Sequence, residues 1–284
     1  GLQVSLRTDV FQMAVFLVIF SIAFIYMIFG SDFSFNSILQ STGVHEQAAR
    51  PGYVLIYVAL LQVFSYPAHD PVMMDRGFIA NQNKTNYSFI LAFLLSTFCI
   101  FGFGMFGIQA GLIGYAYENQ LLGTWQNMFG PGVYFLLICS LLVSAMSTLD
   151  SALASSARLV IDEFYIFKRS IKNGRIAMST FMAFGLLFTL FPSQSLFDAV
   201  AVTGTASMFL TPVMIVTFLG GKIPIWAYTI TWFFSMIGAF AYIFRDIETI
   251  TYLLPGLHKY DQLLSICLYI IVFGFCICFI GALS

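Results

Sequence analysis

The most unusual feature of the sequence is a stripe of polar side chains inside a long apolar segment, residues 131–165. Its members recur at spacings of three and four, so they share one face of a helix. They are Ser144, Ser147, Thr148, Ser151, Ser155, Arg158 and Asp162. Hydrocarbon offers such groups no hydrogen bonds, and an ionisable side chain there is costly unless it has a partner or a wet cavity. The stripe therefore predicts a path or a binding site for something polar.

Ser144, Ser147 and Thr148 could supply several oxygen ligands from one helical turn, and oxygen is the ligand type that small hard cations prefer. The alternative is that these hydroxyls only allow close helix packing, or hydrogen-bond to the preceding turn. Asp150 favours ion binding, because a carboxylate near mid-bilayer should pair with a cation or take up a proton. For Asp150 itself the alternative is a salt bridge to Arg158.

The first apolar segment opens with a second candidate, since Asp9 and Gln12 share a helix face that would suit an ion. Asp9 could equally be an ordinary anchor at the membrane interface.

A third candidate lies at the end of the second apolar segment, where two prolines four residues apart break the helix. Backbone carbonyls freed at such a break are tolerated where they line protein or water, as in discontinuous transporter helices. Tyr66, His69 and Asp70 then become substrate or gate residues. Alternatively, the prolines end the span and His69 and Asp70 are interfacial.

The composition of the chain indicates the class of protein to which these residues belong. The chain is 60% hydrophobic and 9% charged, whereas soluble domains carry about 25% charged residues. We therefore predict an all-α integral membrane protein, with residues 1–284 as a single transmembrane domain. A span needs about 20 apolar residues, and about eight segments qualify: 10–29, 52–71, 87–115, 131–165, 174–192, 195–219, 223–244 and 262–283.

Lysine and arginine positions predict the orientation. With a cytoplasmic first residue, nine of the 12 lie on the cytoplasmic side, and only Arg50, Arg245 and Lys259 lie outside. This positive-inside bias predicts a multi-pass protein of the plasma or inner membrane.

The sixth segment adds two weaker signals. The small residues at 203–207 favour close packing, with gating as the alternative, and Asp198 is expected to be an interfacial charge. No P-loop, GxGxxG, HExxH or nucleophile elbow is present in the sequence, so an enzyme, an organic cofactor and a nucleic-acid partner are not predicted.

Four stretches resemble the sodium:solute symporter family. They are residues 1–12, with the Thr8-Asp9-Val10-Phe11-Gln12 motif, residues 66–80, residues 145–165 and residues 203–212. The third stretch is the most specific and resembles the family's eighth core helix. The resemblance implies the inverted-repeat fold of the leucine transporter, with this sequence beginning at the fifth core helix.

The resemblance also implies roles for the candidate residues. Ser144, Ser147 and Thr148 match ligands of the family's main sodium site. The positions that match a second sodium site of some members are Asp9, Ser147, Asp150 and Ser151. Tyr66 falls near the inner gate over the substrate.

The implied function is a sodium-coupled symporter that imports a small polar solute, with Na⁺ as coupling ion. Its partners would be the solute, the lipid bilayer and four further core helices outside this sequence, without which it is not expected to transport. An ion channel is one alternative, and would predict pore-lining segments with a filter motif. A membrane sensor or enzyme module on a transporter scaffold is another, and would predict a His, Asp and Glu constellation or a soluble tail.

Overall fold

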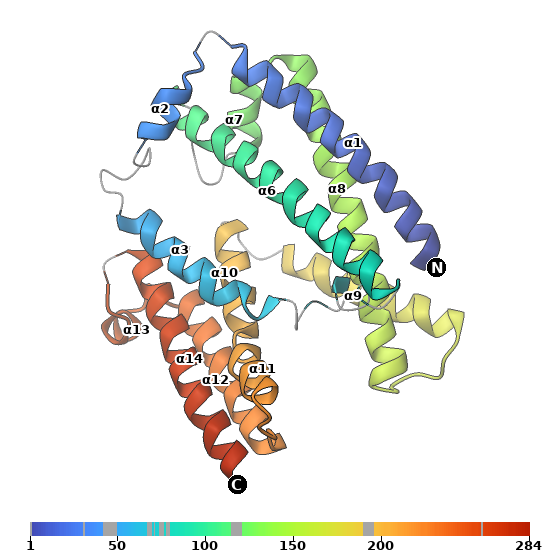
Figure 1. The fold of residues 1–284 in the computed structure, drawn as a ribbon, viewed down its shortest axis with the longest axis vertical. Coiled ribbons are helices and arrows are strands. Elements are labelled where there is room, and N and C mark those ends of the chain that lie inside the picture. Colours follow the sequence, from blue (N-terminus) through green and yellow to red (C-terminus); the bar gives the residue numbers. More distant parts are fainter. Residues whose placement is uncertain are drawn as a thin grey trace. The chain divides into compact units, whose positions relative to one another are not determined.

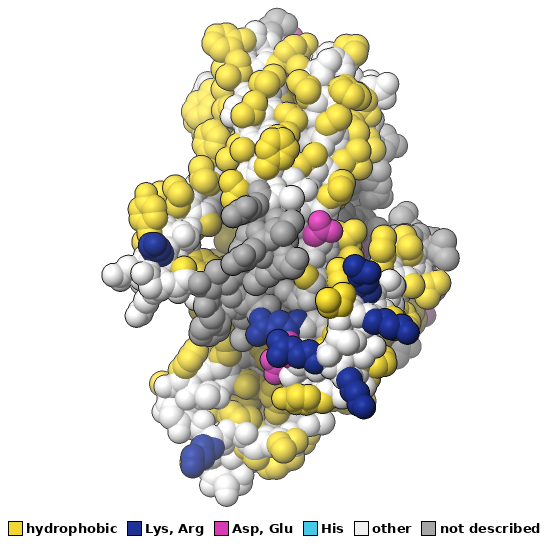
Figure 2. All heavy atoms as spheres, turned by 90° about the vertical axis from the view of Figure 1, so that its right-hand side faces the viewer, with side chains coloured by type: hydrophobic (Ala, Val, Ile, Leu, Met, Phe, Trp, Pro, Cys, Tyr) yellow, Lys and Arg dark blue, Asp and Glu magenta, His cyan; other side chains and the backbone are white. Residues whose placement is uncertain are grey.

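The computed structural model describes residues 2–30, 32–41, 50–66, 70, 72–73, 77, 80–114, 121–189, 196–256 and 258–284. Every regular element in this part of the chain is a helix (Figure 1), which confirms the expected all-α class. Large hydrophobic side chains cover much of the face shown in Figure 2, as is typical of a protein whose solvent is lipid.

Within the described residues, six helices are long and apolar enough to cross a membrane. They coincide with six of the eight predicted segments: Thr8–Ile28, Gln82–Leu112, Pro131–Glu163, Phe197–Phe218, Ile225–Ile243 and Lys259–Leu283. The chain is therefore a helical protein with several membrane-spanning segments.

The other two predicted segments differ from these six. The segment predicted at 52–71 contains α3, Arg50–Val63, a helix of 14 residues that gives way to a turn at residues 64–65. The segment predicted at 174–192 contains α9, Ile171–Thr189, which begins earlier than predicted. Its first turns carry Lys172, Asn173 and Arg175, and these polar residues make α9 less apolar than the six spans.

The contacts of the chain divide it into two compact units, and each is described by itself. Unit 1 comprises Gly1–His45 and Pro71–Ser193, and unit 2 comprises Glu46–Asp70 and Gln194–Ser284.

In unit 1, α1 (Leu2–Ile28) packs along α8 (Pro131–Arg158), and α6 (Gln82–Leu112) contacts α1 (Figure 1). Two short helices, α2 (Phe35–Gln40) and α7 (Leu121–Met128), complete this unit with α9. Phe20 lies at the centre of an aromatic core with Phe106, Trp125 and Leu137. Its ring lies directly against Gly102, where any side chain would collide with it. This core fixes α1 against its neighbours and so positions Asp9 near α8.

In unit 2, α14 (Lys259–Leu283) packs against α3, α11 (Leu210–Phe218) and α12 (Ile225–Ile243). A short helix, α13 (Glu248–Leu253), follows α12. One membrane segment is divided into α10 (Leu196–Ser207) and α11 by a turn at Met208 and Phe209. Pro212 lies just after that turn and has no N–H to continue the hydrogen-bond ladder, so the break has a local cause.

Candidate functional site

The contact between α1 and α8 places Asp9 beside two hydroxyl groups. Ser147 Oγ donates a hydrogen bond to Asp9 Oδ1 at 2.6 Å, and Ser151 Oγ donates to Asp9 Oδ2 at 3.4 Å. The two serines are four residues apart on α8 and therefore share the helix face that α1 covers. Each carboxylate oxygen thus accepts a hydrogen bond from the neighbouring helix.

The oxygen atoms around Asp9 form an environment that is suited to binding a cation. Asp9 lies within the span Thr8–Ile28 and is half-buried, and Ser151 is buried. When a serine hydroxyl donates its proton to the carboxylate, its own lone pairs remain able to coordinate a positive ion. All the atoms brought together here are oxygens, which are the ligands of hard cations.

Gln12 adds an oxygen of the same kind one turn further along α1. Its Oε1 is buried and has no hydrogen-bond partner among the described residues. Buried polar atoms are almost always satisfied, so an orphan of this kind calls for an explanation, such as an ion or a water.

Ser144 and Thr148 lie on a different row of α8. Both are exposed, and Thr148 Oγ1 donates to the carbonyl of Ser144 at 3.1 Å. This is the hydrogen bond to the preceding turn that the packing alternative predicts. Of the three residues matched to the main sodium site, only Ser147 contacts Asp9 in the described structure.

Asp150 is separated from the Asp9 cluster. Its side chain is exposed, and no contact within the described residues joins it to Asp9. Asp162 at the other end of the stripe forms an exposed ion pair with Arg169 at 3.6 Å. The structure therefore brings Asp9, Ser147 and Ser151 together and leaves Asp150 outside that group.

The residues predicted to act on the substrate belong to unit 2. Tyr66 follows the end of α3 and is half exposed, and the N–H of Asp70 donates to the carbonyl of Tyr66 at 3.2 Å. His69 lies outside the described residues.

Unit 2 contains a buried polar cluster that sequence reasoning missed. Gln62 Nε2 of α3 donates to Thr205 Oγ1 at 3.0 Å and to the carbonyl of Ala201 at 3.2 Å. Ser65 and Ser207 share a hydrogen bond at 3.2 Å. Two sequence features point to this cluster: Gln62 is a polar residue in an apolar run, and residues 203–207 are small and partly polar. Packing is the observed role there, because Gly204 lies against the side chain of Gln62.

Asp198 is more than the interfacial charge that was predicted. It is 7% exposed, accepts a hydrogen bond from the Tyr242 hydroxyl at 2.8 Å, and forms an ion pair with Arg245 at 3.4 Å. Paired burial of this kind is how an ionisable group is accommodated away from water. The hydrogen bond to Tyr242 and the ion pair with Arg245 join α10 to the end of α12.

The described residues contain no group of three or more His, Cys, Asp or Glu side chains arranged to hold a metal ion. The oxygen cluster at Asp9 is of another type, with one carboxylate and neutral oxygens. No family model matches the chain, and neither curated proteins nor solved structures give a match. The fold and the site thus define a helical membrane protein with a polar cluster between two membrane helices.

Proposed function

We propose that the chain is one part of the transmembrane domain of a sodium-coupled symporter that imports a small polar solute. The observation that carries this proposal is the Asp9 carboxylate, held inside a membrane segment by the hydroxyls of Ser147 and Ser151. The resemblance to sodium:solute symporters supports the same function from the sequence. The proposed fold is the leucine-transporter type, in a plasma or inner membrane with the first residue cytoplasmic.

In this proposal Na⁺ binds Asp9, Ser147 and Ser151, with the buried oxygen of Gln12 as a further ligand. The ion neutralises the carboxylate and offsets the cost of holding it in hydrocarbon. Ser144 and Thr148, with Ser147, belong to a separate main site. Ion binding favours one conformation of the helices and thereby raises the affinity for the solute.

Sodium-dependent stabilisation of the purified chain tests the ion site directly. Thermal unfolding is measured in detergent, once in NaCl and once in an equal concentration of choline chloride. At a sodium concentration ten times the Kd, binding to the folded state adds about 1.4 kcal/mol. Asp9→Asn is expected to abolish this gain, while Asp150→Asn shows whether that carboxylate also binds the ion.

Asp246→Asn is the matched control, since Asp246 is an exposed carboxylate beyond the end of α12. It should leave the sodium response intact. If the wild-type chain is equally stable in sodium and choline, or if Asp246→Asn removes the response as fully as Asp9→Asn, the ion site is wrong. Coupling to a solute is then tested in the longer chain that the resemblance implies, by uptake into proteoliposomes with and without a sodium gradient.

A further inference from the structure

The connection between α8 and α9 interleaves cations with exposed hydrophobic side chains. Four cations fall within eight residues, and all are exposed: Lys168, Arg169, Lys172 and Arg175. The hydrophobic side chains between and before them are equally open, with exposures of 67% for Phe164, 82% for Tyr165, 63% for Ile166 and 80% for Ile171. Figure 2 shows Lys and Arg side chains gathered beside hydrophobic ones on the face that it presents. This mixture is typical of protein surface that lies at the headgroup level of a bilayer.

Hydrogen bonds give this connection a defined shape. α8 ends in a π-helical turn, Leu159–Glu163, and the N–H of Ile166 donates to the carbonyl of Val160 at 3.1 Å. Asn173 Nδ2 donates to the carbonyl of Lys168 at 2.7 Å and so closes the connection onto the start of α9. The backbone that carries the cations is therefore tied to both helices.

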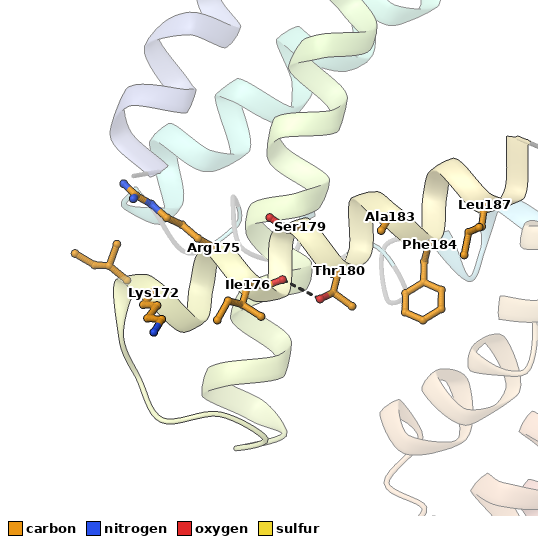
Figure 3. A pocket seen from close by; sticks show the side chains of 9 residues that line it. Lys172, Arg175, Ile176, Ser179, Thr180, Ala183, Phe184 and Leu187 are labelled. Atoms are coloured by element: carbon orange, nitrogen blue, oxygen red, sulfur yellow. Dashed lines mark hydrogen bonds between the residues drawn. The ribbon is translucent and has the colours of Figure 1, made fainter.

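One face of α9 changes in character along its length. It borders a shallow hollow of about 740 Å³, lined from Lys172 and Arg175 through Ser179 and Thr180 to the apolar side chains beyond (Figure 3). Those apolar residues are Ala183, Phe184 and Leu187. The order from cation to hydroxyl to hydrocarbon is the same as the order of polarity along a phospholipid.

The charged end of this face favours an anion for two reasons. The first turn of α9 contains no acidic residue, and the helix dipole gives that end a partial positive charge, although Ser170 Oγ accepts a hydrogen bond from the N–H of Asn173 at 3.1 Å. Lys172 and Arg175 add their charges to it, and neither forms an ion pair within the described residues. The repulsion among these positive groups would be relieved by a bound phosphate.

We propose that the α9 face binds an anionic phospholipid of the surrounding bilayer. The headgroup phosphate lies at Lys172 and Arg175, and an acyl chain follows the apolar residues from Ile176 to Leu187. A soluble anion would use the cations but not the apolar stripe, and a neutral lipid would lack charge to match the cations. The charge pattern of the sequence predicts a cytoplasmic location for this end of α9, and anionic lipids are concentrated in the cytoplasmic leaflet.

Native mass spectrometry of the full chain in detergent can count bound lipids directly. We expect dioleoyl phosphatidylserine to bind more tightly than dioleoyl phosphatidylcholine. Lys172→Gln/Arg175→Gln should weaken phosphatidylserine binding by about thirtyfold, the ratio expected for two surface cations, and should weaken phosphatidylcholine binding much less, because its choline cation offsets the charge of its phosphate. The matched control is Lys84→Gln/Lys222→Gln, which removes two exposed cations elsewhere and should change binding less than twofold.

Competition with soluble glycerophosphoserine separates a lipid site from a simple anion site. The proposal expects no displacement of the lipid by this headgroup, because the acyl chain contributes to binding. It is overturned if the headgroup alone displaces phosphatidylserine, if wild-type protein binds the two lipids equally, or if the control pair loses as much affinity. The wild-type comparisons do not depend on whether a variant folds, and none of these measurements involves sodium or transport.

Discussion

The two serines that contact Asp9 should contribute unequally to stability, and the geometry gives the order. Ser147 Oγ is 2.6 Å from the carboxylate and Ser151 Oγ is 3.4 Å from it. A short hydrogen bond to an ionised group contributes about 1.5–3 kcal/mol to stability. Hydrogen bonds between membrane helices average about 0.6 kcal/mol and reach about 1.7 kcal/mol, so the short Ser147 bond should lie near the upper figure and the long Ser151 bond at or below the average. Ser147→Ala should therefore lower the free energy of unfolding by at least twice as much as Ser151→Ala.

The assay is the free energy of unfolding in detergent micelles, measured for each variant and combined with Asp9→Ala in double-mutant cycles. Ser96→Ala is the matched control, because that hydroxyl is exposed on α6 and bonds only within its own helix, to the carbonyl of Phe93. It should change stability by about 0.5 kcal/mol or less. The reasoning is refuted if Ser151→Ala costs as much as Ser147→Ala, or if the coupling between Ser147 and Asp9 is zero.

Two further variants test unit 2 by the same measurement. Asp198→Asn should cost about 3–5 kcal/mol, because it leaves the partly buried Arg245 without its charged partner; a cost under about 1 kcal/mol would mean that the pair is solvated. Gly204→Ala should cost about 1–3 kcal/mol by overpacking, since the added carbon would lie 2.8 Å from a neighbouring side-chain oxygen. Gly185→Ala on α9 has open space and should instead gain up to about 1 kcal/mol, because Ala is the better helix former; an equal gain at Gly204 would mean that the contact with Gln62 does not limit the packing there.

The six long spans could be predicted because length and apolar content are properties of the sequence itself. The prolines at positions 67 and 71 predict a break in this region, but hydropathy alone did not predict that α3 ends as early as Val63. Hydropathy averages over a window, whereas a helix ends where its backbone hydrogen bonds end. The same averaging placed the start of α9 later than Ile171.

The candidate site was predictable where it depends on position within one helix, and not where it depends on the neighbouring helix. Helical spacing places Ser147 and Ser151 on one face, whereas Asp150 lies about 60° from Ser147 and about 100° from Ser151, so spacing alone does not decide whether Asp150 joins them. Asp198 was undervalued for the complementary reason. Its partners Tyr242 and Arg245 are more than 40 positions away in the sequence, and only packing shows that they meet it.

The polar stripe of α8 is better described as two rows with different neighbours. Ser147 and Ser151 form the row that faces α1, and there Asp9 meets both hydroxyls. Ser144 and Thr148 form a second row, offset from the first by three residues or about 60°, and both are exposed. A cation bound by the second row would need its remaining ligands from an element other than α1. The proposed second sodium site therefore depends on two helices within unit 1, whereas the proposed main site depends on a surface of α8 that α1 does not cover.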